Sequence, residues 1–339
     1  MTSLVLACDV GGTKTRLSLF EPAQGAFNLV RTAQYPSREH ATLAAIIEAF
    51  LDRPAPHLVA AGFGIAGPVV NGKAHTTNLP WTVDGAELAH LLGLPSVSLL
   101  NDVETLAWSV EQLAPSDVVT LRAAASASAG NVAIIAAGTG LGLSALVRNG
   151  GTAVSLASEG GHADFAPRSE LEHDLWRHLA VRFTHVSCER VLSGPGLVNV
   201  YEFLRDTHRG FEPDWLTDAL RGVTDAAPTI AGAALDGSSG LCADALALFI
   251  SIYGAEAGNW ALRTLARGGL YLGGGIAPKL LAPAQVTDAT LHARALFMAA
   301  FADKGRLSPV LEAMPVHVIT NDQAPLLGSA HYALRIATA

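Results

Sequence analysis

The sequence contains little cysteine, and the spacing of those it has excludes two kinds of structure. Its three cysteines, Cys8, Cys188 and Cys242, are scattered, and no two of them share a CxxC spacing. This pattern argues against a disulfide framework and against a thiolate zinc site. We therefore expect no metal site built from these thiols, and a reducing cytoplasm as the location of the protein.

Positive charge is also scarce. Lysine and arginine together number 22 against 30 acidic residues, which gives a formal net charge of -8, and no long basic run occurs. Because proteins attract nucleic acids mainly through basic side chains that contact phosphates, we expect no nucleic acid partner. The expected partner is a small molecule.

No apolar run is long enough to predict a membrane segment. The most lipid-like stretch, residues 245–255, is bounded by Asp244 and Glu256. It is well short of the ~20 residues that a spanning helix needs. Near the N-terminus, "LVLAC" lacks the basic region and the long apolar stretch of a signal peptide. We expect no membrane partner.

What the sequence does contain is an alternation of strand-like and helix-like segments. With 339 residues, half of them apolar, the chain is expected to form two domains with large cores. Apolar runs beside glycine turns predict strands, apolar residues at helical spacing predict helices, and their alternation indicates an α/β fold. Strands are predicted within residues 3–22, 27–35, 57–68, 95–102, 131–151 and 268–281, and helices within residues 40–51, 170–183, 194–206 and 245–266.

Two hairpins of similar design suggest how the chain divides. Residues 3–22 and 131–151 both have the pattern of strand, glycine-rich turn and strand, which suggests two related α/β domains that face one another across a cleft. We predict a small domain from residues 1–115 plus 320–339 and a large domain, with helical additions, from residues 116–319. The other predicted features are connections at residues 122–130 and 206–240, and a strand at residues 314–322 that returns to the first domain.

The first glycine turn, in "DVGGTKT", has the composition of a phosphate-binding loop. Gly11 and Gly12 lack the Cβ that would keep backbone N–H groups away from a phosphate. Thr13 adds a hydroxyl, and Lys14 or Arg16 can offset negative charge. The alternative is a tight hairpin with no ligand. The turn matches neither the Walker P-loop nor GxGxxG.

Two further glycine segments follow the same logic. The turn Gly138–Gly140 in "AAGTGLG" suits a phosphate, and two such turns favour a nucleotide more than either alone. In "LGGGIAP", Gly274 and Gly275 would let a base or ribose approach the backbone. The alternatives are a hairpin turn and an ordinary loop before a helix.

The pair Asn101-Asp102 ends an apolar strand and begins a predicted helix. An aspartate just before "VETLAWSV" is a good N-cap, a role worth about 1 kcal/mol. However, a carboxylate at the C-terminal end of a buried strand also lies where α/β folds bind ligands. There it can accept a proton from a substrate hydroxyl. Both roles are open for Asp102.

Three more polar residues suit the hydroxyl groups of a polyol. Glu159 and His162 are three residues apart in "SEGGHADFAP", and Glu189 stands in "SCERVLSGPGL". Carboxylates accept hydrogen bonds from a diol, and histidine donates or accepts them. A zinc site would need a third ligand, such as Glu189 or Asp164, and Glu189 alone could be a helix-face charge. Phosphoryl transfer to a polyol is the inference from these residues together.

In chain order, the motifs resemble those of the bacterial glucokinase family, in the actin-like ATPase superfamily. They are "DVGGTKTRLSL", "TNLPW", "LLNDVETLA", "GTGLG", "EGGHADFAP", "ERVLSGPGLVNVY", "GGGIAPK" and "FADKGRLSPVLEAMPVHVITNDQAPLLGSA". The resemblance runs from residue 3 almost to the C-terminus. Its most specific part is "EGGHADFAP" together with "SGPGLVNVY".

The resemblance implies two ribonuclease H-like α/β domains, the actin-like ATPase fold, around a central cleft. It also implies transfer of the γ-phosphoryl group of Mg-ATP to the 6-hydroxyl of glucose, with Asp102 as general base, and a homodimer. The implied sugar-binding residues are Asn78, Asn101, Asp102, Glu159, His162 and Glu189. The residues implied to bind ATP and the waters of Mg²⁺ are Asp9, Gly11, Gly12, Thr13, Lys14, Gly138, Thr139, Gly140, Gly274 and Gly275.

The chain departs from the related ROK sugar kinases and repressors in two ways. Those proteins carry a zinc motif, CxCGxxGC, after their ExGH, whereas "HADFAPRSELEHDLW" contains no cysteine, so that no structural zinc is expected. ROK repressors also carry an N-terminal helix-turn-helix, whereas this chain enters its first predicted strand at residue 3. Lys14 stands where other members can have Asn, and its effect on nucleotide preference is open.

Other functions stay open at this point. The protein could phosphorylate another hexose or an N-acetyl sugar, bind sugar and nucleotide as a non-catalytic sensor, or act as an actin-like assembly or chaperone ATPase. Asp102 disfavours the sensor, because a protein that only binds has no need for a base. ADP release that depends on sugar would separate the kinases from the rest.

Overall fold

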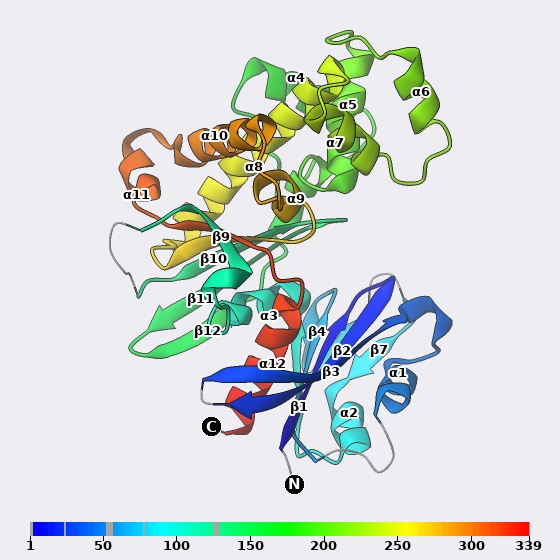
Figure 1. The fold of residues 1–339 in the computed structure, drawn as a ribbon, viewed down its shortest axis with the longest axis vertical. Coiled ribbons are helices and arrows are strands. Elements are labelled where there is room, and N and C mark those ends of the chain that lie inside the picture. Colours follow the sequence, from blue (N-terminus) through cyan, green and yellow to red (C-terminus); the bar gives the residue numbers. More distant parts are fainter. Residues whose placement is uncertain (1–2, 24, 52–56, 77–78, 125–128, 339) are drawn as a thin grey trace. The chain divides into compact units, whose positions relative to one another are not determined.

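The computed structural model describes residues 3–23, 25–51, 57–76, 79–124 and 129–338 of the chain (Figure 1). The fold is mixed α/β, as the alternating pattern predicts. The chain divides into two compact units, unit 1 with Met1–Val118, Val154–Ala157 and Asn321–Ala339, and unit 2 with Val119–Ala153 and Ser158–Thr320.

Unit 1 is built on a five-stranded sheet with the order β3-β2-β1-β4-β8. Strand β2 is antiparallel to both of its neighbours, whereas β4 is parallel to β1 and β8 is parallel to β4. The strands are β1 (Leu4–Val10), β2 (Lys14–Ala23), β3 (Ala26–Pro36), β4 (Leu58–Ile65) and β8 (Ser98–Asn101), with a small sheet of β5 (Val69–Val70), β6 (Lys73–His75) and β7 (Thr82–Asp84). The helices are α1 (Leu43–Phe50), α2 (Gly85–Leu92), α3 (Asp102–Ser109) and α12 (Ala324–Ala337).

Glycines let two helices of unit 1 approach the sheet and each other closely. A Cβ on Gly62 of β4 would lie 2.3 Å from the carbonyl oxygen of Ser329 in α12, and one on Gly64 would lie 2.9 Å from Thr105 in α3. A Cβ on Gly328 would lie 1.7 Å from the carbonyl oxygen of Thr105. Thr105 of α3, three residues after Asp102, is therefore packed closely against β4 and α12.

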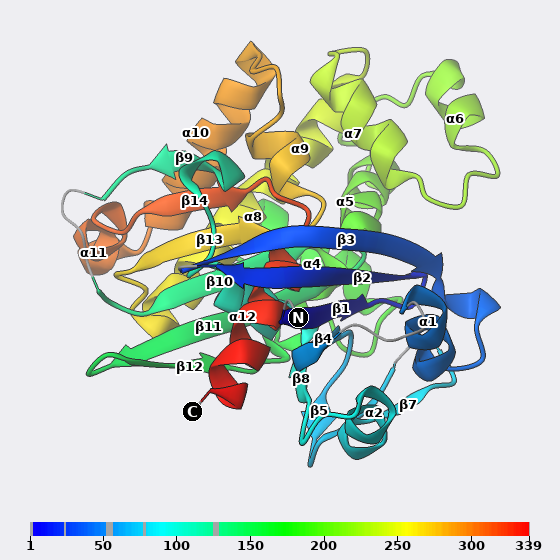
Figure 2. The ribbon, with the colours of Figure 1, turned by 60° about the horizontal axis from the view of Figure 1, so that its bottom comes forward.

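Unit 2 is built on a six-stranded sheet with the order β12-β11-β10-β13-β14-β9 (Figure 2). Its strands are β9 (Val118–Arg122), β10 (Val132–Ala137), β11 (Leu141–Asn149), β12 (Thr152–Leu156), β13 (Gly269–Gly273) and β14 (Val316–Ile319). Residue 118 of β9 and residues 154–156 of β12 are counted with unit 1. The helices of unit 2 are α4 (Glu170–Ala180), α5 (Gly194–Asp206), α6 (Asp214–Leu220), α7 (Ala227–Leu235), α8 (Gly240–Thr264), α9 (Ala277–Leu281), α10 (Asp288–Ala302) and α11 (Ser308–Glu312). Both β10–β11 and β1–β2 are antiparallel hairpins joined by a glycine turn.

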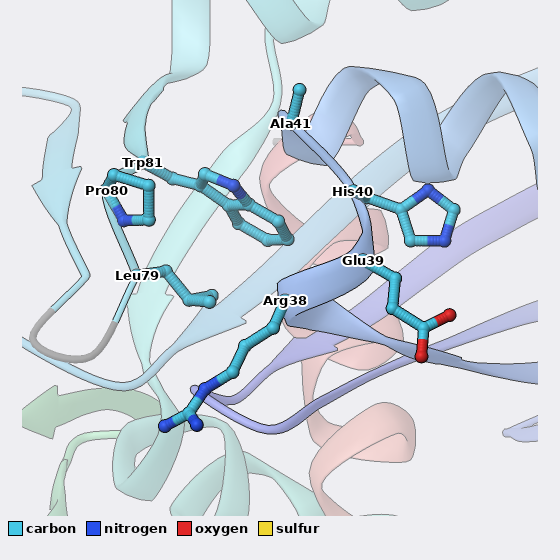
Figure 3. A pocket seen from close by; sticks show the side chains of 7 residues that line it. All are labelled: Arg38, Glu39, His40, Ala41, Leu79, Pro80 and Trp81. Atoms are coloured by element: carbon cyan, nitrogen blue, oxygen red, sulfur yellow. The ribbon is translucent and has the colours of Figure 1, made fainter.

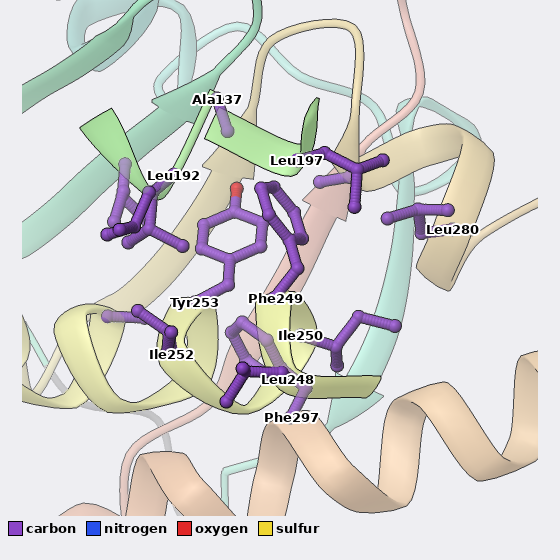
Figure 4. Close-up of a cluster of buried hydrophobic side chains, with 14 of the residues drawn as sticks. Ala137, Leu192, Leu197, Leu248, Phe249, Ile250, Ile252, Tyr253, Leu280 and Phe297 are labelled. Atoms are coloured by element: carbon purple, nitrogen blue, oxygen red, sulfur yellow. The ribbon is translucent and has the colours of Figure 1, made fainter. Parts of the chain in front are cut away.

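The long helix α8 forms the centre of the core of unit 2. By length and composition alone it could cross a membrane, but 72% of its apolar stretch of 18 residues is buried inside the protein. Gly254 and Gly258 bring it against α10, since a Cβ on either would lie 2.2 or 2.4 Å from a carbonyl oxygen of that helix. Figure 4 shows Tyr253 of α8 directed toward Ala137, the last residue of β10, with Phe249 and Phe297 around it.

Two predictions about connections were wrong. Residues 206–240, predicted as a connection, contain α6 and α7. Their apolar side chains are few, but Leu216 and Ile230 are fully buried and hold these short helices to the core. The strand within residues 314–322 does not return to the first domain, because β14 pairs with β13 in the sheet of unit 2. Residues 125–128 of the other predicted connection lie outside the described residues.

Gly328→Ala is expected to destabilise unit 1 severely. Its methyl group would overlap the Thr105 carbonyl, and overpacking of this kind costs about 3 kcal/mol, the upper end of the usual range. Chemical denaturation measures the free energy of unfolding. The control is Gly232→Ala in α7, where nothing lies within 4 Å of the added Cβ, so that a gain of about 0.5–1 kcal/mol is expected. Equal stability of the two variants would contradict this packing.

Candidate active site

The first glycine turn joins β1 to β2 and is held by a residue from beyond β3. The N–H of Gly11 donates to the carbonyl of Lys14 across the turn, 3.0 Å. The hydroxyl of Ser37 donates to the carbonyl of Gly11, 2.8 Å, and the N–H of Ser37 donates to the carbonyl of Thr13, 3.0 Å. Ser37 is fully buried, so it fixes the turn from the inside, while Thr13 and Lys14 stay exposed. Nothing in the sequence pattern marks Ser37 for this role.

The Asp9 carboxylate at the end of β1 is paired with Arg16, which lies directly opposite it on β2. Nε and Nη2 of Arg16 both donate to Oδ2 of Asp9, at 3.2 and 2.8 Å. Nη1 of Arg16 donates to the carbonyl of Asp322, 2.8 Å, just before α12. Because the guanidinium engages only Oδ2, it leaves Oδ1 of Asp9 for another ligand. Arg16 thus ties the end of β1 to the start of α12.

The structure corrects the assignment of the helix cap. Asn101, not Asp102, is the N-cap of α3, because its Oδ1 accepts the N–H of Val103 at 2.9 Å. The amide of Asn101 also donates to the carbonyl of Gly67, 3.2 Å. Asp102 is the first helical residue, so that its carboxylate lies at the positive end of the helix, where Oδ1 also accepts the N–H of Val103 at 2.9 Å. The prediction was wrong by one residue because Asn and Asp are equally good caps in sequence.

The second glycine turn joins β10 to β11 and is held by Glu189. Oε2 of Glu189 accepts the N–H of Leu141 at 2.9 Å, and a Cβ on Gly140 would lie 2.6 Å from the same oxygen. The carbonyl of Gly138 accepts the N–H of Gly194 at 2.8 Å, at the start of α5. Residues 138–140 therefore lie against Glu189 and against the N-terminal end of a helix of 13 residues.

The segment with Glu159 and His162 packs against the same turn. It forms a short 3-10 helix, Gly160–His162, in which a Cβ on Gly161 would lie 1.9 Å from the carbonyl oxygen of Leu141. The N–H of Cys188 donates to the carbonyl of Ala163, 2.8 Å. The sequence motifs around Glu159 and Glu189 are thus brought together in unit 2, with Glu159 and His162 exposed and Glu189 half-buried.

Gly274 is required by the backbone of its loop, whereas Gly275 faces open space. Gly274 has a φ of +76° and a Cβ there would lie 2.3 Å from the Ala137 carbonyl oxygen, so it is required for the bend after β13. A Cβ on Gly275 would meet nothing within 4 Å, and one on Gly138 would meet only the nitrogen of Gly275, at 4.0 Å. Gly138 and Gly275 therefore border one open space.

Asn78, a predicted sugar-binding residue, lies outside the described residues. The three residues that follow it, Leu79–Trp81, line a cavity of about 450 Å³ together with Arg38, Glu39, His40 and Ala41. Figure 3 shows the charged ends of Arg38 and Glu39 pointing away from each other. The residues that follow Asn78 in sequence thus line a cavity.

Neither the Cys188 thiol nor a cluster of metal ligands adds a further reactive group among the described residues. Burial raises the pKa of the Cys188 thiol to about 12, so it stays protonated and is no nucleophile. Over the described ranges, no three His, Cys, Asp or Glu side chains gather as a set that could hold a metal ion. Mg²⁺ needs no such set, because it is commonly held by one or two carboxylates, water and substrate phosphates.

Solved structures with a similar fold include several glucokinases. The crystal structure of a glucokinase from an Antarctic psychrotroph has a TM-score of 0.84 and 29% identity, covering 98% of this chain and 99% of that one. A Balamuthia mandrillaris glucokinase in complex with glucose has a TM-score of 0.77, 20% identity and coverage of 98% and 94%. A ROK family glucokinase from Streptomyces griseus in complex with glucose and AMPPNP has a TM-score of 0.62, 20% identity and coverage of 98% and 99%.

The sequence comparisons narrow this class. The family model for glucokinase matches residues 6–336. The glucokinase of Trichormus variabilis is 40% identical over 349 aligned residues, which cover 98% of this chain and 100% of that protein. The protein is thus an ATP-dependent sugar kinase. It belongs to the glucokinase family.

Gly275→Ala is expected to weaken ATP binding without loss of stability. The added methyl group enters the space that Gly138 and Gly275 border, where the sequence resemblance implies that ATP binds, so the KM for ATP should rise about tenfold, equivalent to about 1.4 kcal/mol. Steady-state kinetics and thermal unfolding measure the two effects. Gly274→Ala is the matched variant, which should instead unfold at a lower temperature. An unchanged KM for ATP in Gly275→Ala would contradict this role for the loop.

Proposed function

We propose that the protein transfers the γ-phosphoryl group of ATP to the 6-hydroxyl of glucose, with Asp102 as the general base. The observation that carries the proposal is that Asn101 is the N-cap of α3, whereas Asp102 is the first residue of the helix. The helix therefore does not need Asp102 as its cap, although Oδ1 of Asp102 also accepts the N–H of Val103 at 2.9 Å. Asp102 stands where β8 ends, the edge at which α/β sheets bind ligands.

In this proposal, Asp102 accepts the proton of the 6-hydroxyl as that oxygen attacks the γ-phosphorus. The step breaks the bond between that phosphorus and its bridging oxygen, and ADP leaves. Phosphoryl transfer has a loose transition state, so catalysis depends mainly on positioning and charge stabilisation. A carboxylate that only takes a proton contributes typically about 10² to 10⁴ in rate.

We assign sugar recognition to Asn78, Asn101, Glu159, His162 and Glu189. Oε2 of Glu189 is bonded to Leu141, which leaves Oε1 for a sugar hydroxyl. Glu159 and His162 are exposed on a segment that packs against Leu141. Acids that bind hydroxyl groups also give selectivity, because an analogue that lacks a hydroxyl leaves them unpaired.

We assign phosphate binding to the two glycine turns and the adenosine to the loop at Gly274 and Gly275. The open space beside Gly138 and Gly275 supports this assignment, as does the N-terminal end of α5 behind the turn at residues 138–140. Asp9 would hold the waters of Mg²⁺ through Oδ1, since Arg16 engages only Oδ2. When bound, Mg²⁺ would neutralise charge on the phosphate oxygens.

We further propose that the two units are ribonuclease H-like domains around a central cleft, and that the protein is a cytoplasmic homodimer without a structural zinc. Three free, buried cysteines support a reducing compartment. The segment after His162, "ADFAPRSELEHDLW", contains no cysteine, which sets the chain apart from the zinc-motif kinases of the ROK family.

The experiment is ADP release by the purified protein with Mg-ATP, without sugar and then with glucose, mannose, fructose and an N-acetyl hexosamine in turn. Release that depends on glucose and has the highest kcat/KM with it supports the proposal. A higher kcat/KM with another sugar would reassign the substrate. Release without any sugar would support an actin-like ATPase instead.

Asp102→Asn is expected to lower kcat for glucose at least about 10²-fold, because the amide cannot accept the proton. The affinity for glucose, measured by calorimetry, should change little, since the variant keeps the shape of the side chain and the Asn101 cap. A variant that retains more than about a tenth of the wild-type kcat would exclude the general-base role.

A further inference from the structure

We infer that Glu104 is a positioning residue that holds the Asn101-Asp102 pair and the strand before Glu159 at the same time. This inference rests on the proposed function, because it concerns the residue proposed as the base. Glu104 lies in the first turn of α3, two residues after Asp102.

The two carboxylate oxygens of Glu104 have different partners. Oε2 accepts the backbone N–H of Asn101 at 3.2 Å, and Oε1 accepts the hydroxyl of Ser155 at 2.7 Å. Both bonds are partly buried. The first bond is the returning half of a capping box, which closes the turn that contains Asp102.

The second bond is not part of a capping box. A capping box uses one oxygen of the glutamate, and here the other oxygen reaches a residue 51 positions away. Ser155 belongs to β12 and to the segment Val154–Ala157, which is part of unit 1. Four residues after Ser155 the chain reaches Glu159.

One side chain therefore joins the turn that carries Asp102 to the segment Val154–Ala157, which ends two residues before Glu159. Without Glu104, the Asn101 N–H loses its acceptor and Ser155 loses its partner, so the first turn of α3 and the end of β12 are no longer joined by a hydrogen bond. Errors of about 1 Å in the position of a reacting group can cost 10²-fold in rate. Glu104 thus acts through Asp102 and the segment before Glu159, not on the sugar.

The test compares Glu104→Ala, Glu104→Gln and Ser155→Ala in the full-length protein. Glu104→Ala should lower kcat about tenfold with the KM for ATP unchanged. Glu104→Gln should restore most of kcat, because its amide offers an acceptor to Asn101 and a donor to Ser155. The double variant Glu104→Ala/Ser155→Ala should be no slower than Glu104→Ala alone, because both changes remove the same bond.

Hydrogen exchange gives a readout that does not depend on turnover. The peptide that spans residues 98–106 should lose amide protection in Glu104→Ala and keep it in Glu104→Gln. Glu48→Ala, which removes an exposed carboxylate on α1, is the control and should change neither kcat nor this protection.

Three results would overturn the inference: wild-type kcat in Glu104→Ala, a loss in Glu104→Gln as large as in Glu104→Ala, or unchanged amide protection in Glu104→Ala. A wild-type protein that phosphorylates none of the sugars would instead reject the proposed function. In that case the exchange result alone decides whether Glu104 holds the turn.

Discussion

The site in unit 2 depends on one hydrogen bond, from the backbone N–H of Leu141 to the carboxylate of Glu189. Leu141 directly follows the second glycine turn, and its own carbonyl lies against Gly161. Three segments far apart in sequence, at residues 138–141, 160–162 and 188–190, therefore meet at one residue. A charged acceptor makes this bond stronger than an ordinary backbone bond, so the turn proposed to bind phosphate and the residues proposed to bind sugar are fixed together.

In unit 1 the same principle holds with other residues. Ser37 fixes the first glycine turn from inside, Arg16 joins Asp9 to the start of α12, and Asn101 takes the helix cap beside Asp102. In each case a hydrogen bond fixes the position of a proposed active-site group. Fixed positions suit phosphoryl transfer, in which the protein contributes mainly position and charge.

The sequence predicted the α/β class, both glycine hairpins and the helices α1, α4, α5 and α8, because glycine turns and apolar periodicity are local signals. It could not predict Ser37 at the first turn or Ser155 beside Glu104, since both bonds join residues more than 20 positions apart. The pattern N-x-x-E in "NDVE" would have identified Glu104 as half of a capping box and Asn101 as the cap. Residues 206–240 were missed because two or three buried apolar residues suffice to hold α6 and α7.

The central claim is that the phosphoryl group reaches the 6-hydroxyl of glucose. The most direct measurement is the position of the phosphate in the product, from phosphorus–proton couplings in the NMR spectrum of a reaction with glucose and Mg-ATP. The account predicts coupling to the two protons on carbon 6. Coupling to a proton on any other carbon, or a signal from inorganic phosphate alone, would contradict it.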